Sequence, residues 1–367
     1  MKLTHVVFHR LHLPLVSPFR TSFGTETSRN ALLVQVIGPD AIGWGECVAD
    51  AEPLYSAEFS EGAQEVIARF LLPRLTPNNV QAEDLATQFA PVRGNFMAKG
   101  GIEAAVLDAQ CRVAGQPLSQ RLGAVVDRVP AGVSVGIQSS IGQLLETVDG
   151  YLAQGYQRIK LKIEPGSDVA LVRAVREAHP DIQLQVDANQ AYTLADADTL
   201  AQLDPFELLL IEQPLAEEDV RGHATLAKLI RTPICLDESI VSVRSTREAI
   251  ELGAVHVVNI KPGRVGGYLE AVRIHDVCVE AGIAVWCGGM LETGVGRAAN
   301  VALAALPGFT LPGDTSASDR YFHRDVTEAF VLHDGYLNVP TGPGIGVEPL
   351  PDALAEFTVA TTTVQLN

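Results

Sequence analysis

The 367-residue sequence predicts an α/β protein: a (β/α)8-type TIM barrel preceded by a smaller α+β capping domain. Three observations lead to this prediction. After residue 129, short apolar runs recur, and each is followed by a stretch with helical spacing. Polar residues near the ends of successive runs recur every 24 or 25 residues, close to what a strand, a crossover helix and two short loops need. The first 48 residues alternate apolar and polar positions instead, which is typical of antiparallel strands.

The capping domain is predicted to span residues 1–125. Its first 48 residues include the alternating stretches THVVFHRLHL and NALLVQVIG, which indicate antiparallel strands. Residues 57–123 carry apolar side chains at three- and four-residue spacing, as in AEFSEGAQEVIARFLLPRL and KGGIEAAVLDAQCRVAG, and this spacing indicates helices. A small α+β domain is the simplest interpretation of the two halves together.

The barrel domain is predicted to span residues 126–330. Its seven clear strand runs are VSVGI, RIKLKI, IQLQVDA, ELLLIEQ, PICLDES, HVVNIKP and IAVWCGG, and a weaker eighth lies near FTLPGD. Buried parallel strands are apolar along their whole length because helices cover one face and packed side chains cover the other. A doubly wound open sheet is the alternative, but no GxGxxG motif follows the first strand.

The C-terminal segment, residues 331–367, does not continue the repeat. It is rich in Gly and Pro and contains short strand-like pieces, as in VLHDGYLNVPTGPGIGVEPL. We therefore expect it to fold back across the barrel and to complete the capping domain.

Charge and composition exclude several classes of partner. The formal charge is −17, from 27 Lys+Arg against 44 Asp+Glu, which disfavours nucleic acid and anionic membrane surfaces. No run reaches the roughly 18 apolar residues of a transmembrane helix. The N-terminus MKLTHVVFHRLHLPL lacks the apolar core and cleavage site of a signal peptide. Five cysteines without a CxxC pair indicate reduced thiols, so a cytoplasmic protein is expected.

Three acidic residues form a candidate metal site. Asp187, Glu212 and Asp237 lie 25 residues apart, at the ends of three successive predicted strands, and barrel active sites lie at these ends. Adjacent strands are about 4.8 Å apart, so three carboxylates there can converge on one ion. An all-oxygen set favours Mg²⁺ or Mn²⁺ over zinc. The alternative is that each acid pairs with a basic neighbour or caps the following helix.

Lysines form a candidate acid/base pair. Lys160 and Lys162 lie two apart on one strand and therefore share a face, whereas Lys261 ends a later strand and is expected on the opposite side of the barrel mouth. A lysine in an apolar interior near a divalent ion should have a lowered pKa and can serve as a general base. The alternative, that the lysines only neutralise the acids, suits Lys160 best.

Two bases that face each other across a substrate suit one reaction well. A metal ion that binds a substrate carboxylate stabilises the enediolate formed when the α-proton leaves. If one lysine removes that proton and the other delivers a proton to the opposite face, the stereocentre is inverted. The pattern therefore predicts a racemase that transfers protons at one carbon.

Five motifs together resemble one known family. They are KLK (160–162), VDAN (186–189), IEQP (211–214), LDES (236–239) and NIKPGRVGG (259–267). In this order they resemble the enolase superfamily, muconate-lactonizing subgroup, for which a lysine base beside Mg²⁺ is known. The resemblance covers almost the whole chain, through SPFRTSFG, GWGEC, IEAAVLDAQCRVAGQPL, WCGGMLETGVGR and LPGDTSAS. Within the subgroup it points to the N-acylamino acid racemases, also called N-succinylamino acid racemase/o-succinylbenzoate synthases.

The resemblance implies a role for each matching residue. Asp187, Glu212 and Asp237 would bind the metal, Lys162 and Lys261 would form the acid/base pair, and Lys160 would assist Lys162. Ser134 and Asn189 would lie near the substrate, and Glu238 would lie behind the metal ligands, although a helix cap is an alternative for it. Arg264 would lower the pKa of Lys261 as part of the substrate site; an ordinary surface ion pair is the alternative.

Two further groups of residues are expected around the substrate. Gly288, Gly289 and Met290 would let backbone N–H groups approach a ligand carboxylate, although two glycines also suit a tight turn. Phe19, Phe23 and Tyr55 lie in segments that resemble the family's two loops over the barrel mouth, and they would form a wall for an acyl group. As isolated aromatics they would be packing residues.

The resulting hypothesis is a Mg²⁺- or Mn²⁺-dependent racemase of N-acyl amino acids, with N-succinyl amino acids favoured. An o-succinylbenzoate synthase of menaquinone biosynthesis, acting by elimination of water in the same site, is the alternative. A dipeptide epimerase typically has a DxD pair after the last strand, whereas this sequence has GDTS (313–316) with Asp314 alone. A cycloisomerase and a non-catalytic metal-binding barrel are more distant. The resemblance also implies a homo-oligomer with a small-molecule carboxylate substrate.

Overall fold

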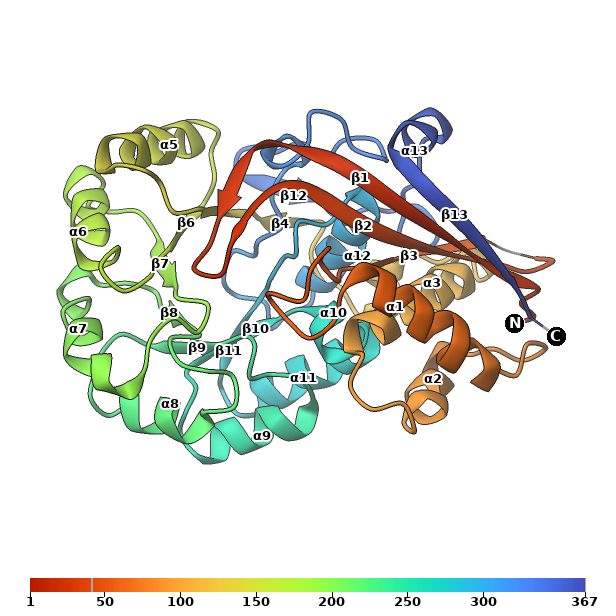
Figure 1. Cartoon of the computed structure of the whole chain (residues 1–367), viewed down its shortest axis with the longest axis horizontal. Coiled ribbons are helices and arrows are strands. Elements are labelled where there is room, and N and C mark those ends of the chain that lie inside the picture. The colour runs from red at the N-terminus through yellow and green to blue at the C-terminus, as the bar shows by residue number, and fades with distance from the viewer. Residues whose placement is uncertain (41, 367) are drawn as a thin grey trace.

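A computed structural model describes residues 1–40 and 42–366 of the chain. Seven parallel strands form a curled sheet in the order β5 to β11, and an antiparallel sheet of β13, β1, β2 and β3 stands beside it. In Figure 1 the helices α5 to α9 and α11 lie on the outside of the parallel sheet, and the long β1–β2 ribbon extends from the capping sheet over the barrel. This arrangement confirms the predicted fold class.

The capping sheet alternates buried and exposed positions along β1, as the sequence predicts. Its strands are β1 (His5–Arg20), β2 (Thr25–Ile37), β3 (Ile42–Cys47) and β13 (Thr358–Gln365). The helical elements packed beside them are α1 (Ser60–Val66), the π-helical η1 (Ile67–Leu71), the 3₁₀ turn η2 (Leu72–Arg74), α2 (Ala82–Phe89), α3 (Phe96–Val113) and α4 (Leu118–Leu122). Strands and helices therefore occupy the predicted parts of this half.

The barrel strands coincide with the seven apolar runs. They are β5 (Gly132–Val135), β6 (Arg158–Lys162), β7 (Leu184–Asp187), β8 (Ile211–Glu212), β9 (Ile234–Leu236), β10 (Val257–Ile260) and β11 (Ala284–Cys287). The helices between and after them are α5 (Ile141–Ala153), α6 (Val169–Ala178), α7 (Ala197–Ala201), α8 (Val220–Leu226), α9 (Val243–Glu251), α10 (Pro262–Val265), α11 (Tyr268–Glu280) and α12 (Gly294–Ala304). Short 3₁₀ turns lie at η3 (Leu194–Asp196), η4 (Asp204–Phe206) and η5 (Ser318–Arg320).

The weaker eighth unit closes the ring without forming a regular strand. Phe309 makes an isolated parallel bridge to Val285 of β11, and Gly313 makes another to Ala131 next to β5. The N–H of Gly132 donates to the carbonyl of Gly313 at 2.7 Å. Because both free edges of the parallel sheet are bridged by this segment, the open-sheet alternative is wrong.

The C-terminal segment returns to the capping sheet. Strand β13 pairs antiparallel with β1, with His5 opposite Gln365, and β12 (Tyr336–Asn338) pairs with β4 (Arg128–Pro130). Figure 1 shows β13 running beside β1 toward both chain ends. The segment also contains helix α13 (Pro351–Phe357), which its Gly/Pro-rich composition did not indicate; a proline in the first turn suits a helix start. The domain limits at residues 125 and 330 stay predictions.

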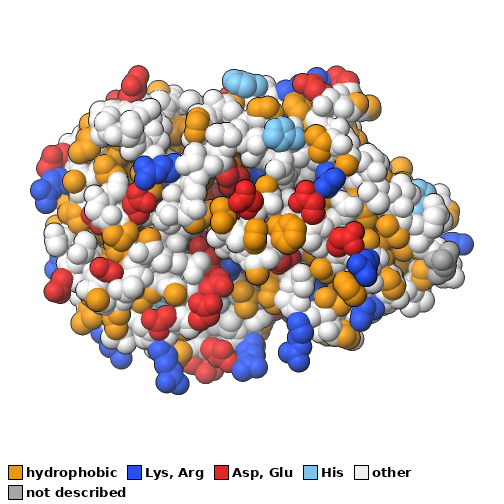
Figure 2. Space-filling view, in the orientation of Figure 1, with side chains coloured by type: hydrophobic (Ala, Val, Ile, Leu, Met, Phe, Trp, Pro, Cys, Tyr) orange, Lys and Arg blue, Asp and Glu red, His pale blue; other side chains and the backbone are white. Residues whose placement is uncertain are grey.

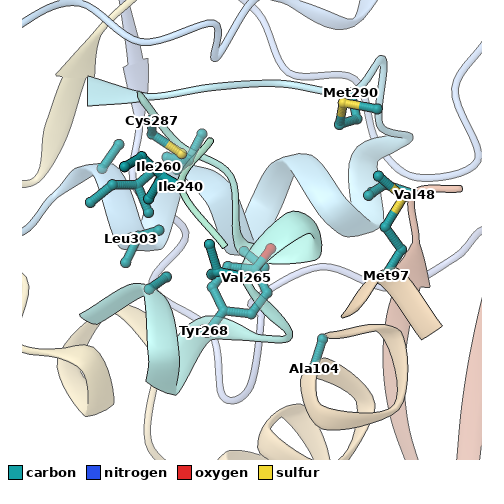
Figure 3. Packing of buried hydrophobic residues seen from close by; sticks show 14 of the residues in the cluster. Val48, Met97, Ala104, Ile240, Ile260, Val265, Tyr268, Cys287, Met290 and Leu303 are labelled. Carbon is teal, nitrogen blue, oxygen red and sulfur yellow. The ribbon is translucent and has the colours of Figure 1, made fainter. Parts of the chain in front are cut away.

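The capping domain and the barrel are packed closely against each other. Figure 3 shows Val48, Met97 and Met290 gathered together, with Val265 and Tyr268 close to the helix that carries Ala104. Within the capping domain, helix α3 approaches β3 so closely that a Cβ at Gly43 would lie 2.1 Å from the carbonyl oxygen of Ala105. A glycine at position 43 is therefore required for this contact.

Glu103 of α3 is a buried acid at this junction. Its carboxylate accepts hydrogen bonds from the N–H groups of Tyr268 (2.8 Å) and Leu269 (2.9 Å) at the start of α11. Burial disfavours the charged form more than these N–H groups favour it, and it raises the pKa of Glu103 to about 7. The protonated form is thus stabilised in the folded state.

We expect Glu103→Gln to flatten the pH dependence of stability. The folded-state pKa lies above the ordinary 4.5, so the folded chain binds this proton more tightly than the unfolded chain does. The corresponding stability is present below about pH 4.5 and is lost as the pH rises to about 7, a loss of about 3 kcal/mol. Denaturant unfolding from pH 4.5 to 7.5 checks this, with the exposed Glu65→Gln as control. If the free energies of unfolding of wild type and Glu103→Gln differed by the same amount at every pH in this range, the raised pKa of Glu103 would be contradicted.

The start of the capping domain covers the barrel mouth. The N–H of Ile137, after β5, donates to the carbonyl of Arg20 at 2.9 Å. The hydroxyl of Ser22 donates to the carbonyl of Ala188, after β7, at 3.4 Å. The β1–β2 hairpin therefore rests on the carboxyl ends of the barrel strands.

Surface features agree with the composition. Asp and Glu side chains are prominent around the middle of the face in Figure 2, where Lys and Arg side chains lie mostly toward the rim. Within residues 1–40 and 42–366, no helix combines the length and the apolar character needed to cross a membrane.

Candidate active site

The three predicted acids lie at the carboxyl ends of adjacent strands. Asp187 and Glu212 are opposite each other in the β7–β8 register, and Asp237 directly follows β9. All three side chains are buried, with at most 1 % of any of these residues exposed. Buried carboxylates require partners, and in this structure the partners are lysines.

Lys160 and Lys162 bind the first two acids. The ammonium of Lys162 donates to Asp187 Oδ2 and to Asn189 Oδ1, each at 2.6 Å. Lys160 donates to Glu212 Oε2 at 2.9 Å and lies 3.3 Å from Asp187 Oδ2. The two lysines share one face of β6, as their spacing predicts, and both point among the acids.

Lys261 binds the third acid from across the ring. Its ammonium donates to Asp237 Oδ2 at 2.7 Å and to the hydroxyl of Tyr55 at 3.0 Å. Lys261 follows β10, and three strands, β7 to β9, separate β10 from β6. In a ring of eight units that separation places Lys162 and Lys261 on opposite sides of the mouth, and both line the same pocket.

The ionisation of this cluster follows from burial and charge. Burial raises the pKa of Glu212, and the neighbouring charge of Asp187 raises it further, to about 8. Burial acts in the same direction on Asp187 and Asp237, but attraction to Lys162 and Lys261 respectively outweighs it and lowers both pKa values.

Two lysines of the site have raised pKa values in this arrangement, and the lowered pKa expected for a lysine beside a divalent ion stays a prediction. Burial lowers the pKa of Lys261, but the negative charge of Asp237 raises it well above its usual value. The pKa of Lys160 is likewise raised, because Asp314 and Glu212 outweigh burial. The acids, rather than the apolar interior, dominate the electrostatics of both lysines.

The acids fit a hard cation by their chemistry, but they are not gathered around a common point. Among the residues that the structure describes, no three His, Cys, Asp or Glu side chains lie at metal-binding spacing, because the lysines lie among the acids. All donors are carboxylate oxygens, which suits Mg²⁺ or Mn²⁺. The neighbouring Glu238 is buried, and its Oε2 has no hydrogen-bond partner. Asp187, Glu212 and Asp237, with Glu238 behind them, can therefore hold a divalent cation if the lysines give way.

A small pocket is lined by the lysines that bind the acids, although Asp187, Glu212 and Asp237 themselves are not among its lining residues. Of the predicted residues, it is lined by Phe19, Phe23, Tyr55, Ser134, Lys160, Lys162, Asn189, Lys261, Gly289 and Met290. Its volume is about 40 Å³, which is room for very few water molecules. An amino-acid-sized ligand is larger than this space, so its binding requires residues around the pocket to move. We call this space the reaction pocket.

Three predicted residues have different surroundings from those expected. Arg264 does not line the reaction pocket; it lies behind Asp237, with its Nε 3.1 Å from Asp237 Oδ1. It is buried, so the surface-pair alternative is wrong. Gly288 allows close packing, since a Cβ there would lie 2.2 Å from Asn259 Oδ1. Tyr55 does more than form a wall, because its hydroxyl donates to Asp237 Oδ2 at 3.2 Å.

Asp314 and Asn259 are among the buried residues of the site that the sequence did not identify; Thr21 and Tyr321, which also line the reaction pocket, are two others. Asp314 lines the reaction pocket; its Oδ2 lies 2.7 Å from Lys160 Nζ, and its Oδ1 lies 2.8 Å from Arg158 Nη2. The side-chain N–H of Asn259 donates to Glu212 Oε1 at 2.6 Å. Asn259 lies two residues before Lys261, so the shared-face rule that linked Lys160 to Lys162 could have identified it.

Strained backbone accompanies the site. Four non-glycine residues shortly after strand ends have positive φ angles: Asn189 (40°), Gln190 (67°), Gln213 (37°) and Leu291 (55°). Such conformations cost on the order of 1–3 kcal/mol each and persist only where the surroundings hold them. The side-chain amide of Gln213, for example, donates to Ser239 Oγ at 2.8 Å.

Comparisons with known proteins cover both halves of the chain. The family description "Mandelate racemase / muconate lactonizing enzyme, N-terminal domain" matches residues 4–123, and "Enolase C-terminal domain-like" matches residues 143–353. An N-succinylamino acid racemase from Amycolatopsis sp is 61 % identical over 362 residues, with 98 % of each chain covered. An o-succinylbenzoate synthase from Geobacillus kaustophilus is 48 % identical over 351 residues, which covers 95 % of this chain and 94 % of the relative.

Solved structures give the same result. An enolase superfamily member from Listeria innocua superimposes with a TM-score of 0.96 at 40 % identity, and all of both chains is covered. An N-succinyl Arg/Lys racemase from Bacillus cereus superimposes with a TM-score of 0.93 at 27 % identity, over 99 % of this chain and all of that one.

Proposed function

The chain belongs to the enolase superfamily, in the group of mandelate racemase and muconate lactonizing enzyme, and from this premise we propose that it racemises N-acyl amino acids with a divalent cation. N-succinyl amino acids are the favoured substrates, in keeping with the name of the Amycolatopsis relative, N-succinylamino acid racemase. The observation that carries the proposal is the position of Lys162 and Lys261, which line one pocket from opposite sides of the ring.

The two lysines have complementary roles in the proposed reaction. One takes the α-proton from one face of the substrate, and the other, as its ammonium, delivers a proton to the opposite face. Besides its acid, the Nζ of each lysine has an uncharged partner, Asn189 for Lys162 and Tyr55 for Lys261, which can position it while the acids hold the cation. Interchange of the roles converts the other enantiomer.

Asp187, Glu212 and Asp237 would hold the cation. When bound, it would supply positive charge to the substrate carboxylate as negative charge grows there, and it would offset the acidic charge that raises the pKa of Lys160 and Lys261. Lys160 keeps a positive charge beside Glu212 and Asp314. We propose that either Mg²⁺ or Mn²⁺ can occupy this site.

Tyr55→Phe is expected to reduce activity moderately. The change removes the hydroxyl that donates to Asp237 and accepts from Lys261 but keeps the aromatic ring, over which Lys261 Nζ lies at 4.9 Å. Loss of one such hydrogen-bonding group should lower kcat/KM about tenfold. Steady-state racemisation in both directions measures this, and Tyr55→Leu, which also loses the ring, should lower kcat/KM further. Equal activity of wild type and both variants would contradict a positioning role.

An o-succinylbenzoate synthase is the second candidate function. The relative from Geobacillus kaustophilus, which is 48 % identical, is named o-succinylbenzoate synthase. In that elimination Lys162 would take the α-proton, and Lys261 would remain a cation beside the negative charge. The same pocket can serve both reactions, so both are assayed.

Dipeptide epimerisation is disfavoured by the surroundings of Asp314. An epimerase needs an acid free to bind the substrate's ammonium group. Both carboxylate oxygens of Asp314 are already within 2.8 Å of a cation, Lys160 or Arg158. An acylated, uncharged nitrogen makes no such demand.

The experiment that tests the proposal is a racemisation assay with the purified chain, Mg²⁺ or Mn²⁺, and single enantiomers of several N-succinyl amino acids. Optical rotation should fall to zero from either enantiomer. A parallel reaction contains the hydroxylated precursor that loses water to form o-succinylbenzoate, and absorbance follows the formation of this product. Activity in neither assay would contradict both candidate functions.

Two other expectations stay proposals. We propose a reducing compartment, the cytoplasm, since all five cysteines are buried and unpaired. The homo-oligomeric state implied by the family resemblance also stays a prediction.

A further inference from the structure

Two openings adjoin the reaction pocket, and their charges are opposite. The first shares Thr21, Phe23, Glu26 and Asp50 with the reaction pocket and has a volume of about 270 Å³. Its charged lining residues within the described chain are all acidic: Glu26, Asp50 and Glu52. A second negative charge on a substrate would be repelled there.

The second opening is basic. It lies between the end of β1 and the start of α5, and we call it the Arg320 groove, after the residue at its base. Its polar lining includes Arg20, Gln138, Ser139, Gln143, Thr147 and Arg320, and its volume is about 390 Å³. No Asp or Glu of the described residues lines it. It meets the reaction pocket at the ring of Phe19, which lines both.

Arg320 is a buried cation without an acidic partner. The residue is only 6 % exposed, and within the described chain its guanidinium makes no ion pair. Its Nη2 donates to the carbonyl of Ser134 at 2.7 Å, while its Nε has no hydrogen-bond partner. Its positive charge lies over the rings of Tyr321 (4.7 Å), Tyr151 (5.1 Å) and Phe19 (5.5 Å). These contacts fix the side chain but leave its charge uncompensated by an anion.

The start of helix α5 adds to the positive field. This 13-residue helix begins after Ser140, whose side chain accepts the N–H of Gln143. Ser139 and Gln143, at this end, line the groove. The N-terminus of a helix carries partial positive charge and favours an anion nearby.

We propose that the Arg320 groove is a binding site for an aliphatic carboxylate, such as the one that ends a succinyl chain. This inference rests on the proposed function, because the carboxylate is taken to belong to the acyl group of the substrate. That group extends past Phe19 and places its terminal carboxylate against Arg320 and Arg20. A planar guanidinium binds a carboxylate through two hydrogen bonds at once. Because Arg320 also holds the carbonyl of Ser134, whose side chain lines the reaction pocket, the site is coupled to the reaction centre.

The test compares two acyl groups of equal length on one amino acid: N-succinyl, which ends in a carboxylate, and N-succinamoyl, which ends in a neutral amide. Wild type should prefer the succinyl substrate by about tenfold or more in kcat/KM, since a charge-assisted pair to arginine is lost with the amide. Arg320→Met should bring the ratio close to one, and Arg320→Lys should give an intermediate ratio.

A second pair of variants protects the test against misfolding of the Arg320 variants. Arg20 is at the surface, where it pairs with Glu164 at 2.8 Å, so Arg20→Gln should fold and should lower the ratio. Glu164→Gln is the matched control: it breaks the same pair without removing the arginine and should preserve or raise the ratio. An unchanged ratio in both Arg20→Gln and a folded Arg320 variant would overturn the proposal.

A third arm distinguishes the source of the carboxylate. Free succinate is titrated by calorimetry into wild type and Arg20→Gln. Arginine-dependent binding of succinate with a substrate ratio near one would support the carboxylate site but assign it to a separate ligand. A ratio near one in wild type without succinate binding would overturn it. Racemisation of the neutral N-succinamoyl substrate reports on the proposed function independently of either outcome.

Discussion

Replacement of Lys162 or of Lys261 by alanine is expected to lower kcat/KM for racemisation by about 10²- to 10⁴-fold, the usual contribution of a general acid or base. Both ammonium groups line the reaction pocket, and they approach it from opposite sides of the ring. Loss of either one leaves a face of the substrate carbon without a proton donor or acceptor. Racemisation requires both faces, so each single variant should be as inactive as the other.

Arginine variants separate proton transfer from charge pairing. Removal of Lys162 leaves Asp187 buried with one cation fewer, which alone can destabilise the fold by several kcal/mol. Lys162→Arg and Lys261→Arg keep the positive charge, but a guanidinium stays protonated and cannot act as a base. Both should therefore be inactive while their melting temperatures stay closer to wild type than those of the alanine variants. The exposed Lys228→Ala is the control; wild-type activity in either arginine variant would contradict the two-base account.

Asp187→Asn is the second change with a large expected effect. It removes one charge from the proposed cation site and also removes the partner that holds Lys162 at 2.6 Å. Both effects disturb the reaction, so kcat/KM should fall at least 10³-fold, the scale of a lost transition-state charge interaction. Calorimetric titration with Mg²⁺ and Mn²⁺ should show weakened cation binding.

A chelator arm and a matched acid complete this test. EDTA should abolish the activity of wild type, and added Mg²⁺ or Mn²⁺ should restore it. Asp149→Asn removes an acid that is 65 % exposed and should change neither cation binding nor activity. Full activity of wild type in EDTA, or wild-type cation affinity in Asp187→Asn, would contradict the assignment of this site.

The sequence was sufficient to predict the strands of the barrel and the residues at their ends. The 25-residue interval from Asp187 to Glu212 reflects one local unit of a strand, a helix and two loops. Its prediction therefore requires no knowledge of contacts between distant segments. The lysine pair at positions 160 and 162 was equally predictable, because alternation along a strand places both on one face.

Pairings between distant segments were not predictable in this way. Asp314 joins the site because the irregular eighth unit closes the ring beside β5, where Ser134 and Arg158 meet it. Arg320 becomes a buried cation through aromatic rings from three separate segments. Neither position carries a local pattern that marks its partners.

The electrostatics also depended on the folded geometry. The residue pattern predicts three acids around a common ion and lysines in an apolar interior. In the structure the attraction between Lys261 and Asp237 raises the pKa of the lysine, and the acids are held by lysines. Whether an acid contacts a lysine or a cation depends on the length and orientation of the side chains, which the spacing of residues along the sequence does not specify.

The most direct test of the two-base account is racemisation of one N-succinyl amino acid enantiomer in D₂O, followed by ¹H NMR and separation of the enantiomers. Two lysines on opposite faces predict that the product enantiomer carries deuterium at the α-carbon from the first turnovers, while the remaining substrate keeps its α-proton at early times. Product that retains the original α-proton would show a single base returning it to the other face, and that result would contradict the account.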